Sequence, residues 1–394
     1  MRDTVALQNH FKWKGKIETH AKVDVSSTDM LALAYTPGVA DACLAIQERP
    51  ELSFQLTGRA NTVAVITDGT AILGLGNIGP EAGMPVMEGK CALFKTFGNV
   101  DAVPICLRTT DTEEIITTIK YLEGSFGGIN LEDISAPRCF EIESRLKREL
   151  SIPVFHDDQH GTAIVVGAAL INACKLVGKS ISDITAVVNG AGAAGTAIGK
   201  YLLHMGVKDV IMVDRCGILV RGAHYENKAH EEIAEITNNR NLSGDLAAAM
   251  RGADLFVGVS VGDIVSVDMV RSMAQDPIIF ALANPVPEIT PYKAIQGGAA
   301  VVGTGSSQYP NQINNVLVFP GLFRGALDVR ATDINMEMMT AASYGIASII
   351  TDDELFPLCI LPQAVDIRAH KAVAQAVRQA AIKSGAAKIK FTQN

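Results

Sequence analysis

The sequence predicts an α/β protein with two parts: a doubly wound parallel, Rossmann-like NAD-binding domain, and before it an N-terminal α/β substrate domain. Three observations lead to this prediction. Short apolar segments typical of buried strands alternate with helical segments along the chain. A glycine-rich turn separates a strand from a helix in the second half. The length of 394 residues also exceeds what one hydrophobic core usually serves. We place the boundary at the acidic segment, giving domains of residues 1–155 and 156–394.

The composition is that of a globular protein, and the chain has no excess of positive charge with which to bind nucleic acid. Hydrophobic residues make up 48% of the chain, charged residues 19%, and the formal net charge is -8. The apolar runs, such as 163–170 and 278–283, are far shorter than the roughly 20 residues a membrane span needs. Seven cysteines form no C-x-x-C pair, and the N-terminus shows no leader pattern. We therefore expect a cytoplasmic protein with reduced thiols and neither nucleic acid nor membrane as a partner.

Two side chains of the first half are candidates for acid–base chemistry. Tyr35 precedes a Thr-Pro-Gly turn, and is either a half-buried packing residue or a hydroxyl that points into a cleft. Lys90 follows Gly89 within an apolar segment. Burial lowers the pKa of a lysine toward that of a general base, whereas a lysine at a helix start more often extends its amine to solvent.

The segment Gly74-Leu-Gly-Asn-Ile-Gly79 matches G-x-G-x-x-G but stands in the wrong context. A short strand is expected before it at 71–73. Pro80 and Pro85 follow where the phosphate-binding helix should run, and no strand ending in an acid comes about 20 residues later. We reject it as the nucleotide site and expect a substrate loop.

Acidic residues follow two predicted strands of the first domain. A strand that begins near Gly127 ends in Glu132 and Asp133, and Asp157 and Asp158 come after the apolar run at 152–155. Open α/β sheets place ligands at the carboxyl ends of their strands, and Mg²⁺ or Mn²⁺ takes oxygen ligands. The cluster suggests a divalent metal site that includes Asp158. The alternative is that Asp157 and Asp158 cap the following helix.

The second half contains a dinucleotide-binding fingerprint in its full context. A strand at 184–188 leads into a glycine-rich turn, a helix follows to about Met205, and the next strand ends at Asp214, 19 residues after Gly195. Asp214 suits the ribose hydroxyls of NAD, while Arg215 could offset its charge and leaves NADP open. The predicted cofactor-binding turn consists of Gly190, Ala191, Gly192, Ala193, Ala194 and Gly195.

Further strands are expected at 254–260, 277–283 and 299–305. Asn284 follows the second of these, and Asn315 precedes an apolar run. Uncharged amides suit the binding of a substrate carboxylate or of the nicotinamide edge, although most such asparagines only form turns.

With these motifs in place, the chain resembles the malic enzyme family in its short bacterial-type form over nearly its whole length. One position departs from the pattern: the long eukaryotic-type members carry a carboxylate-binding arginine where this chain has Ala71. The motifs that carry the resemblance are Tyr35-Thr-Pro-Gly-Val, Ile72-Leu-Gly-Leu-Gly-Asn-Ile-Gly79, Gly89-Lys90, Leu131-Glu-Asp-Ile, His156-Asp-Asp-Gln-His-Gly-Thr-Ala163, Asn284-Pro, Asn314-Asn-Val and Phe319-Pro-Gly321.

The resemblance implies roles for these residues. Glu132, Asp133 and Asp158 would hold Mg²⁺ or Mn²⁺, and Asn284 and Asn315 would hold the substrate, Asn284 also lying at the cofactor. The implied reaction is oxidative decarboxylation of L-malate to pyruvate and CO₂ with NAD or NADP. Lys90 would be the general base and Tyr35 the general acid that protonates the enolpyruvate. Members of the family are typically dimers or tetramers, so we expect a homo-oligomer.

Three other interpretations are consistent with parts of the sequence. One is a metal-dependent 2-hydroxy acid dehydrogenase that does not release CO₂, and another is a malolactic variant that releases lactate with no net NADH. The third is a nucleotide-sensing module with an inactive site. The joint presence of Tyr35, Lys90 and all three acids argues against the third.

Overall fold

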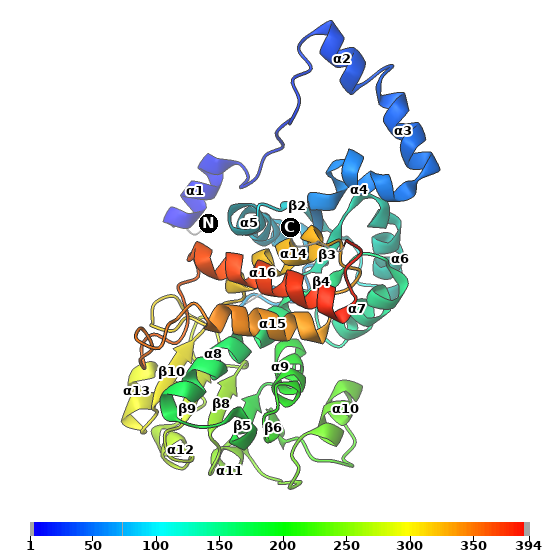
Figure 1. The fold of residues 1–394 in the computed structure, drawn as a ribbon. Helices are drawn as coiled ribbons and strands as arrows, with labels where there is room; N and C mark the ends of the chain where they lie inside the picture. The colour runs from blue at the N-terminus through cyan, green and yellow to red at the C-terminus, as the bar shows by residue number, and fades with distance from the viewer. Residues whose placement is uncertain (1–3, 73, 390–394) are drawn as a thin grey trace.

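The computed structural model of the chain describes residues 4–72 and 74–389, and two largely parallel sheets organise it (Figure 1). The first sheet has the order β2-β1-β3-β4, all parallel. The second has the order β10-β9-β8-β5-β6-β7, in which β7 alone runs antiparallel. The first-sheet strands are β1 Thr62–Thr67, β2 Asp101–Cys106, β3 Gly128–Leu131 and β4 Val154–His156. The second-sheet strands are β5 Thr185–Asn189, β6 Asp209–Asp214, β7 Gly217–Ile218, β8 Leu255–Gly258, β9 Ile278–Ala281 and β10 Val301–Thr304.

The strand order confirms the predicted fold class. Sequential parallel strands are joined by helical crossovers, and the inner strands are buried on both faces, as parallel sheets require; the edge strand β2 is only partly buried. The helices of the first half are α4 Ser53–Leu56, α5 Pro80–Gly98, α6 Thr112–Leu122 and α7 Arg138–Glu149. Those of the second half are α8 Thr162–Val177, α9 Ala193–His204, α10 Lys228–Ile236, α11 Leu246–Met250, α12 Val267–Arg271, α13 Pro291–Gln296, α14 Phe319–Asp328, α15 Met336–Ala347 and α16 Ile367–Ser384.

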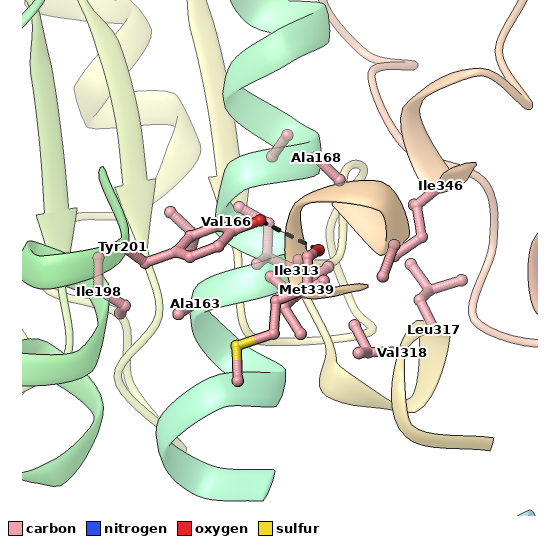
Figure 2. Close-up of a cluster of buried hydrophobic side chains, with 14 of the residues drawn as sticks. Ala163, Val166, Ala168, Ile198, Tyr201, Ile313, Leu317, Val318, Met339 and Ile346 are labelled. Carbon is pink, nitrogen blue, oxygen red and sulfur yellow. Dashed lines mark hydrogen bonds between the residues drawn. The ribbon is translucent and has the colours of Figure 1, made fainter. Parts of the chain in front are cut away.

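Helix α8 follows the first sheet and precedes the second in the chain, and it lies in the hydrophobic core. Residues 163–174 are buried without interruption, so the helix is apolar on every face. It packs against α9 and α15, and side chains of all three helices meet in the cluster of Figure 2. There the Tyr201 hydroxyl donates to the Met339 carbonyl, which satisfies a buried polar group. A turn of π-helix, η4 (Asp157–Gly161), leads into α8 and carries the acidic segment.

Short 3₁₀ turns complete the chain, and several local predictions need correction. The expected strand at 71–73 is not formed: Ile72 makes only an isolated bridge to Gly76, and residue 73 lies outside the described residues. Helix α5 begins at Pro80, a favoured first position, and continues through Pro85. The two prolines therefore do not prevent a helix after the first glycine-rich loop. The 3₁₀ turns are η1 Pro50–Leu52, η2 Gly58–Asn61, η3 Glu123–Ser125, η5 Ile181–Asp183 and η6 Asn315–Leu317.

The N-terminal segment stands apart from the body of the molecule. After α1 (Val5–Trp13), an extended stretch leads to α2 (Thr28–Ala34) and α3 (Val39–Glu48), which project away from both sheets (Figure 1). None of the described residues in α2 or α3 is buried. We call residues 28–48 the N-terminal arm.

Two helical stretches are long and apolar enough to cross a membrane by length and composition alone, Thr28–Glu48 and Asp157–Val177. This differs from the expectation that no apolar run reaches that length. The second stretch contains α8, and 72% of its window is buried inside the protein, which identifies it as a core helix. The first is the N-terminal arm, which lies near the N-terminus. One or two such helices are weak evidence for a span, because core helices meet the same criterion.

Candidate active site

Three carboxylates meet at the carboxyl edge of the first sheet. Glu132 and Asp133 follow β3, Asp158 follows the adjacent strand β4, and one oxygen from each lies within 4.8 Å of the others. Asp133 adopts a positive φ of 53°, and its backbone N–H donates to Asp158 Oδ2 at 2.7 Å. The fold thus brings together the three predicted metal ligands, which parallel pairing of β3 with β4 made possible.

Lys90 extends from the middle of α5 into this cluster, so it is not a solvent-directed lysine at a helix start. Its Nζ lies 2.6 Å from Asp157 Oδ2 and 2.8 Å from Glu132 Oε1, and 4.2 Å above the ring of Phe319. Only 8% of the residue is exposed. A buried ammonium with two carboxylate partners and an aromatic face is held in one position.

Asp157 belongs to the candidate site, and the sequence reasoning gave it no role other than a possible cap. It is fully buried, and neither it nor Asp158 caps α8, which has no side-chain cap. The capping interpretation is therefore wrong for both. A buried lysine requires an anionic partner, and an acid after an adjacent strand was the available signal. Gly161 leaves room for this carboxylate, since a Cβ there would lie 2.0 Å from Asp157 Oδ1.

The charges of the cluster are strongly coupled. Burial raises the pKa of Glu132 to about 7 and of Asp133 to about 9, and the neighbouring carboxylates add to both shifts. Burial also raises the pKa of Asp157 to about 7 and of Asp158 to about 6, although Lys90 opposes these shifts. One lysine faces four acids, so three negative charges remain uncompensated when all are ionised.

The pKa of Lys90 is raised, which contradicts the expectation of a lowered value. Burial alone lowers it, but Asp157, Glu132 and Asp158 outweigh burial and favour the ammonium. A divalent cation held by the carboxylates would cancel two of the three excess charges and so weaken the effect that opposes burial. Oxygen ligands, negative charge and access through the partly exposed Asp158 all fit Mg²⁺ or Mn²⁺. The cluster therefore fits the predicted metal.

Glu143 of α7 holds the turn that carries the acids. Its buried carboxylate accepts hydrogen bonds from the His156 backbone N–H at 3.2 Å and the Gln159 amide at 3.3 Å, and it lies 2.9 Å from His160 Nε2. Burial raises the pKa of Glu143, but His160 outweighs it and the net shift is downward, so the carboxylate stays ionised. The sequence offered no signal for this residue beyond an acid in an amphipathic helix.

The loop before α5 approaches the same edge. The backbone N–H of Ala71, the position that lacks the family arginine, donates to the Asp133 carbonyl at 3.0 Å. The guanidinium of Arg138 reaches the preceding residue, donating to Thr70 Oγ1 at 3.0 Å, and pairs with buried Asp68 at 2.8 Å. This cation is therefore already engaged in holding the loop.

The glycine-rich turn lies between β5 and α9 at the carboxyl edge of the second sheet. A Cβ on Gly195 would lie 1.6 Å from the Gly190 carbonyl, so only glycine allows this close packing. A Cβ on Gly192 would meet nothing within 4 Å, which leaves the backbone open to a diphosphate at the start of α9. Asp214 ends β6, and its Oδ1 accepts the Cys216 N–H at 2.7 Å. This geometry fits a dinucleotide.

The two asparagines occupy different places. Asn315 begins η6 beside the turn of the acids, because a Cβ on Gly161 would lie 3.1 Å from Asn315 Cβ. Asn284 is exposed after β9 on the second sheet, and its amide donates to the Leu282 carbonyl at 3.4 Å. Buried Glu288 fixes that loop by accepting the backbone N–H groups of Ser260 and Ala283, each at 3.0 Å.

Two predicted site residues lie outside these clusters. Tyr35 follows α2 on the N-terminal arm and is 65% exposed; in the described residues its hydroxyl makes no hydrogen bond. The structure does not bring it to Lys90 within one chain. Arg215 is exposed and, in the described part of the chain, forms no ion pair with Asp214.

The chain is similar to known proteins over most of its length. Residues 14–147 match the family model for the malic enzyme N-terminal domain, and residues 159–382 match that for the malic enzyme NAD-binding domain. The chain is 56% identical to the NAD-dependent malic enzyme of Geobacillus stearothermophilus, over 95% of this chain and 78% of the relative. It is 55% identical to the bifunctional malic/malolactic enzyme of Bacillus subtilis, over 98% and 94%.

A solved structure agrees as well. The crystal structure of the NAD-dependent malic enzyme from Thermotoga maritima superposes with a TM-score of 0.92 at 51% identity, covering 95% of this chain and 99% of that one. Other curated relatives are named NADP-dependent malic enzymes.

Proposed function

The chain belongs to the malic enzyme family of NAD(P)-dependent oxidoreductases, and from that premise we propose that it oxidises and decarboxylates L-malate to pyruvate and CO₂ in the cytoplasm. The observation that carries this proposal is the buried Lys90, joined to Asp157 and Glu132 at the edge of the acidic cluster. A plain nucleotide-binding module would have no use for a buried ammonium beside three metal-ligand carboxylates.

Two bound groups would supply chemistry that side chains lack. Glu132, Asp133 and Asp158 would hold Mg²⁺ or Mn²⁺, which would polarise the C2 oxygen of the substrate, and the glycine-rich turn would hold NAD or NADP as the hydride acceptor. Asn315, beside the turn of the acids, would orient a substrate carboxylate, and Asn284 would lie toward the nicotinamide.

Lys90 would remove the proton of the C2 hydroxyl. For this it must first be neutral, and the surrounding carboxylates raise its pKa and favour the ammonium. A cation held by Glu132, Asp133 and Asp158 would offset their charge and so lower the pKa of Lys90 toward that of a base, while Asp157 continues to favour the ammonium. Asp157, bonded to Nζ, keeps the amine aimed at the cluster.

Tyr35 would protonate C3 of the enolpyruvate, but from a neighbouring subunit. The N-terminal arm exposes large apolar side chains to solvent, among them Leu31, Leu33 and Leu44, which are 46%, 70% and 62% exposed. Two short helices with no buried residue are not stable alone in water, so the arm needs a covering surface. A second copy would cover it and receive Tyr35 in its own cleft, making the protein a homodimer or a larger oligomer of such dimers.

An absorbance assay at 340 nm tests the reaction. L-Malate and Mn²⁺ are supplied with NAD and NADP in turn, and pyruvate is quantified. Equal amounts of reduced cofactor and pyruvate are expected. Reduced cofactor without pyruvate would instead mean a dehydrogenase that retains CO₂.

Mixed subunits test the shared site. Lys90→Ala and Tyr35→Phe variants, each nearly inactive, are unfolded together and refolded as a mixture. If Tyr35 serves the neighbouring subunit, each hybrid dimer regains one intact site, and statistical mixing restores about a quarter of the wild-type activity. If Tyr35 serves its own subunit, every site still carries one substitution and the mixture stays inactive.

A malolactic reaction is the second candidate, because the Bacillus subtilis relative is named for both activities. Its product would be lactate, formed from malate with no net change in NADH. Lactate measured in the same assay, at constant absorbance, would identify it.

A further inference from the structure

The ribose subsite implied by the proposed function is bordered by two features of this chain. One is the glycine-rich turn at residues 190–195, and the other is Asp214 at the end of the adjacent strand β6. Asp214 is the acid expected to receive ribose hydroxyls. Since its Oδ1 already accepts the Cys216 N–H, Oδ2 is the atom left for a ligand.

His230 lies close to both of these features. It stands in the first turn of α10, 39 residues beyond Ala191 in sequence. Its Nε2 is 2.9 Å from the Ala191 carbonyl, and its Nδ1 is 3.7 Å from Asp214 Oδ2. Of the cationic side chains in residues 4–72 and 74–389, His230 is the one within ion-pair distance of Asp214. The sequence suggested that Arg215 could offset the charge of Asp214, and in the structure the imidazole of His230 lies nearest to do so.

The hydrogen bond to Ala191 fixes which nitrogen carries the proton. A carbonyl oxygen only accepts, so Nε2 must donate, and in the neutral imidazole Nδ1 then presents a lone pair to the Asp214 carboxylate. The subsite then carries one full negative charge. Protonation of Nδ1 creates an N–H that faces Asp214, and the net charge of the pair becomes zero.

These two states suit different ligands. A ribose with a free 2′-hydroxyl donates a hydrogen bond and is best received by an uncompensated carboxylate. A 2′-phosphate adds about two negative charges, which Asp214 repels and an imidazolium attracts. We propose that His230 determines the choice between NAD and NADP: its neutral form leaves the Asp214 charge in place and selects NAD, and its protonated form admits NADP.

Few other ionisable groups face the imidazole. The glycine-rich turn contributes only a carbonyl, and α9 has no ionisable side chain from Ala193 to Gly199. The loop before α10 contributes Tyr225, whose ring meets the imidazole edge-on with centroids 6.0 Å apart. On α10 itself the nearest charged residues in sequence are Lys228, Glu231 and Glu232.

Equilibrium binding of NAD and NADP by calorimetry, without malate or metal, tests the inference between pH 7.0 and 8.5. For the wild type, NADP affinity relative to NAD should rise as pH falls, by up to about tenfold per pH unit when one proton is taken up with the ligand. His230→Gln retains a donor for the Ala191 carbonyl but cannot become charged. In this variant the NADP affinity relative to NAD should stay at the high-pH value of the wild type, apart from the change caused by titration of the 2′-phosphate itself.

The matched control is His224→Gln, an exposed histidine whose Nδ1 lies 2.7 Å from Glu231. It should keep the wild-type pH dependence. If the NADP affinity relative to NAD changed with pH in the same way in the wild type and in His230→Gln, the proposed role of His230 would be overturned. If neither dinucleotide bound the wild type, the proposed function itself would fail, so the two failures are distinguishable.

Discussion

Lys90 and Tyr35, the two halves of the proposed acid–base pair, are held in opposite ways. Lys90 is 8% exposed and contacts two carboxylates and an aromatic ring of its own chain. Tyr35 is 65% exposed on an arm with no buried residue. The proposed base is therefore positioned by contacts within its own chain, whereas the proposed acid makes no such contacts in the described residues and would depend on a neighbouring subunit. The difference teaches that one folded subunit contains most, but not all, of the proposed site.

The largest expected effect is that of Lys90→Ala. Turnover should fall by about 10²–10⁴-fold at every protein concentration, because the base and its partners lie in one chain. NAD binding should persist, since the glycine-rich turn lies on the other sheet. Steady-state kinetics and calorimetry measure the two. The control is Lys95→Ala on the same helix, whose side chain is 56% exposed. Near-normal turnover of Lys90→Ala would remove it as the base.

Asp158→Asn should weaken Mn²⁺ binding by about 100-fold or more, because a direct ligand matters at least as much as the residues that orient ligands. Activity should fall in parallel at subsaturating Mn²⁺. Titration of Mn²⁺ followed by electron paramagnetic resonance gives the affinity. The control is Asp254→Asn, since Asp254 lies just before β8 of the second sheet and its carboxylate pairs with Lys179. Unchanged metal affinity would exclude Asp158 from the site.

Leu33→Asp on the N-terminal arm tests the other side of the comparison. A charge on this apolar surface should weaken subunit association by about tenfold or more. Activity should then depend on protein concentration, unlike that of Lys90→Ala, and sedimentation velocity should show monomers at low concentration. Tyr121→Asp, at a side chain that is 84% exposed outside the arm, serves as the control. A monomer with full activity would refute the shared site.

The smallest effect concerns pH and stability. The pKa values of Glu132 and Asp133, about 7 and about 9, exceed those of unfolded carboxyls near 4, so the folded chain binds more protons. In metal-free protein, stability should therefore fall as pH rises from about 4 to 9. Mn²⁺ should raise the melting temperature by a few degrees more at pH 8.5 than at pH 6. Calorimetric scans with EDTA and with Mn²⁺ measure the melting temperatures. An equal rise in melting temperature at the two pH values would contradict the prediction.

Much of the candidate site could be predicted because its signals are local. The glycine-rich turn, the helix after it and Asp214 at the end of β6 form one strand–turn–helix–strand unit, whose spacing is fixed by turn chemistry and strand length. Acids after β3 and β4 were predicted to meet because parallel strands end at one edge of a sheet. The same reasoning was wrong around Pro85, which lies inside helix α5. It was also wrong at the strand expected over 71–73, where Ile72 makes only an isolated bridge to Gly76.

The sequence by itself determined the fold class, the dinucleotide turn and the acidic edge, because hydrophobic periodicity and turn residues act over a few neighbours. Only the tertiary structure decided which side chains pair across the chain. Lys90 meets Asp157 67 residues away, and His230 meets Ala191 39 residues away. The raised pKa of Lys90 and the exposure of Tyr35 were decided in the same way. Burial and charge depend on every element that packs nearby, and that arrangement exists only once the sheets and helices have assembled.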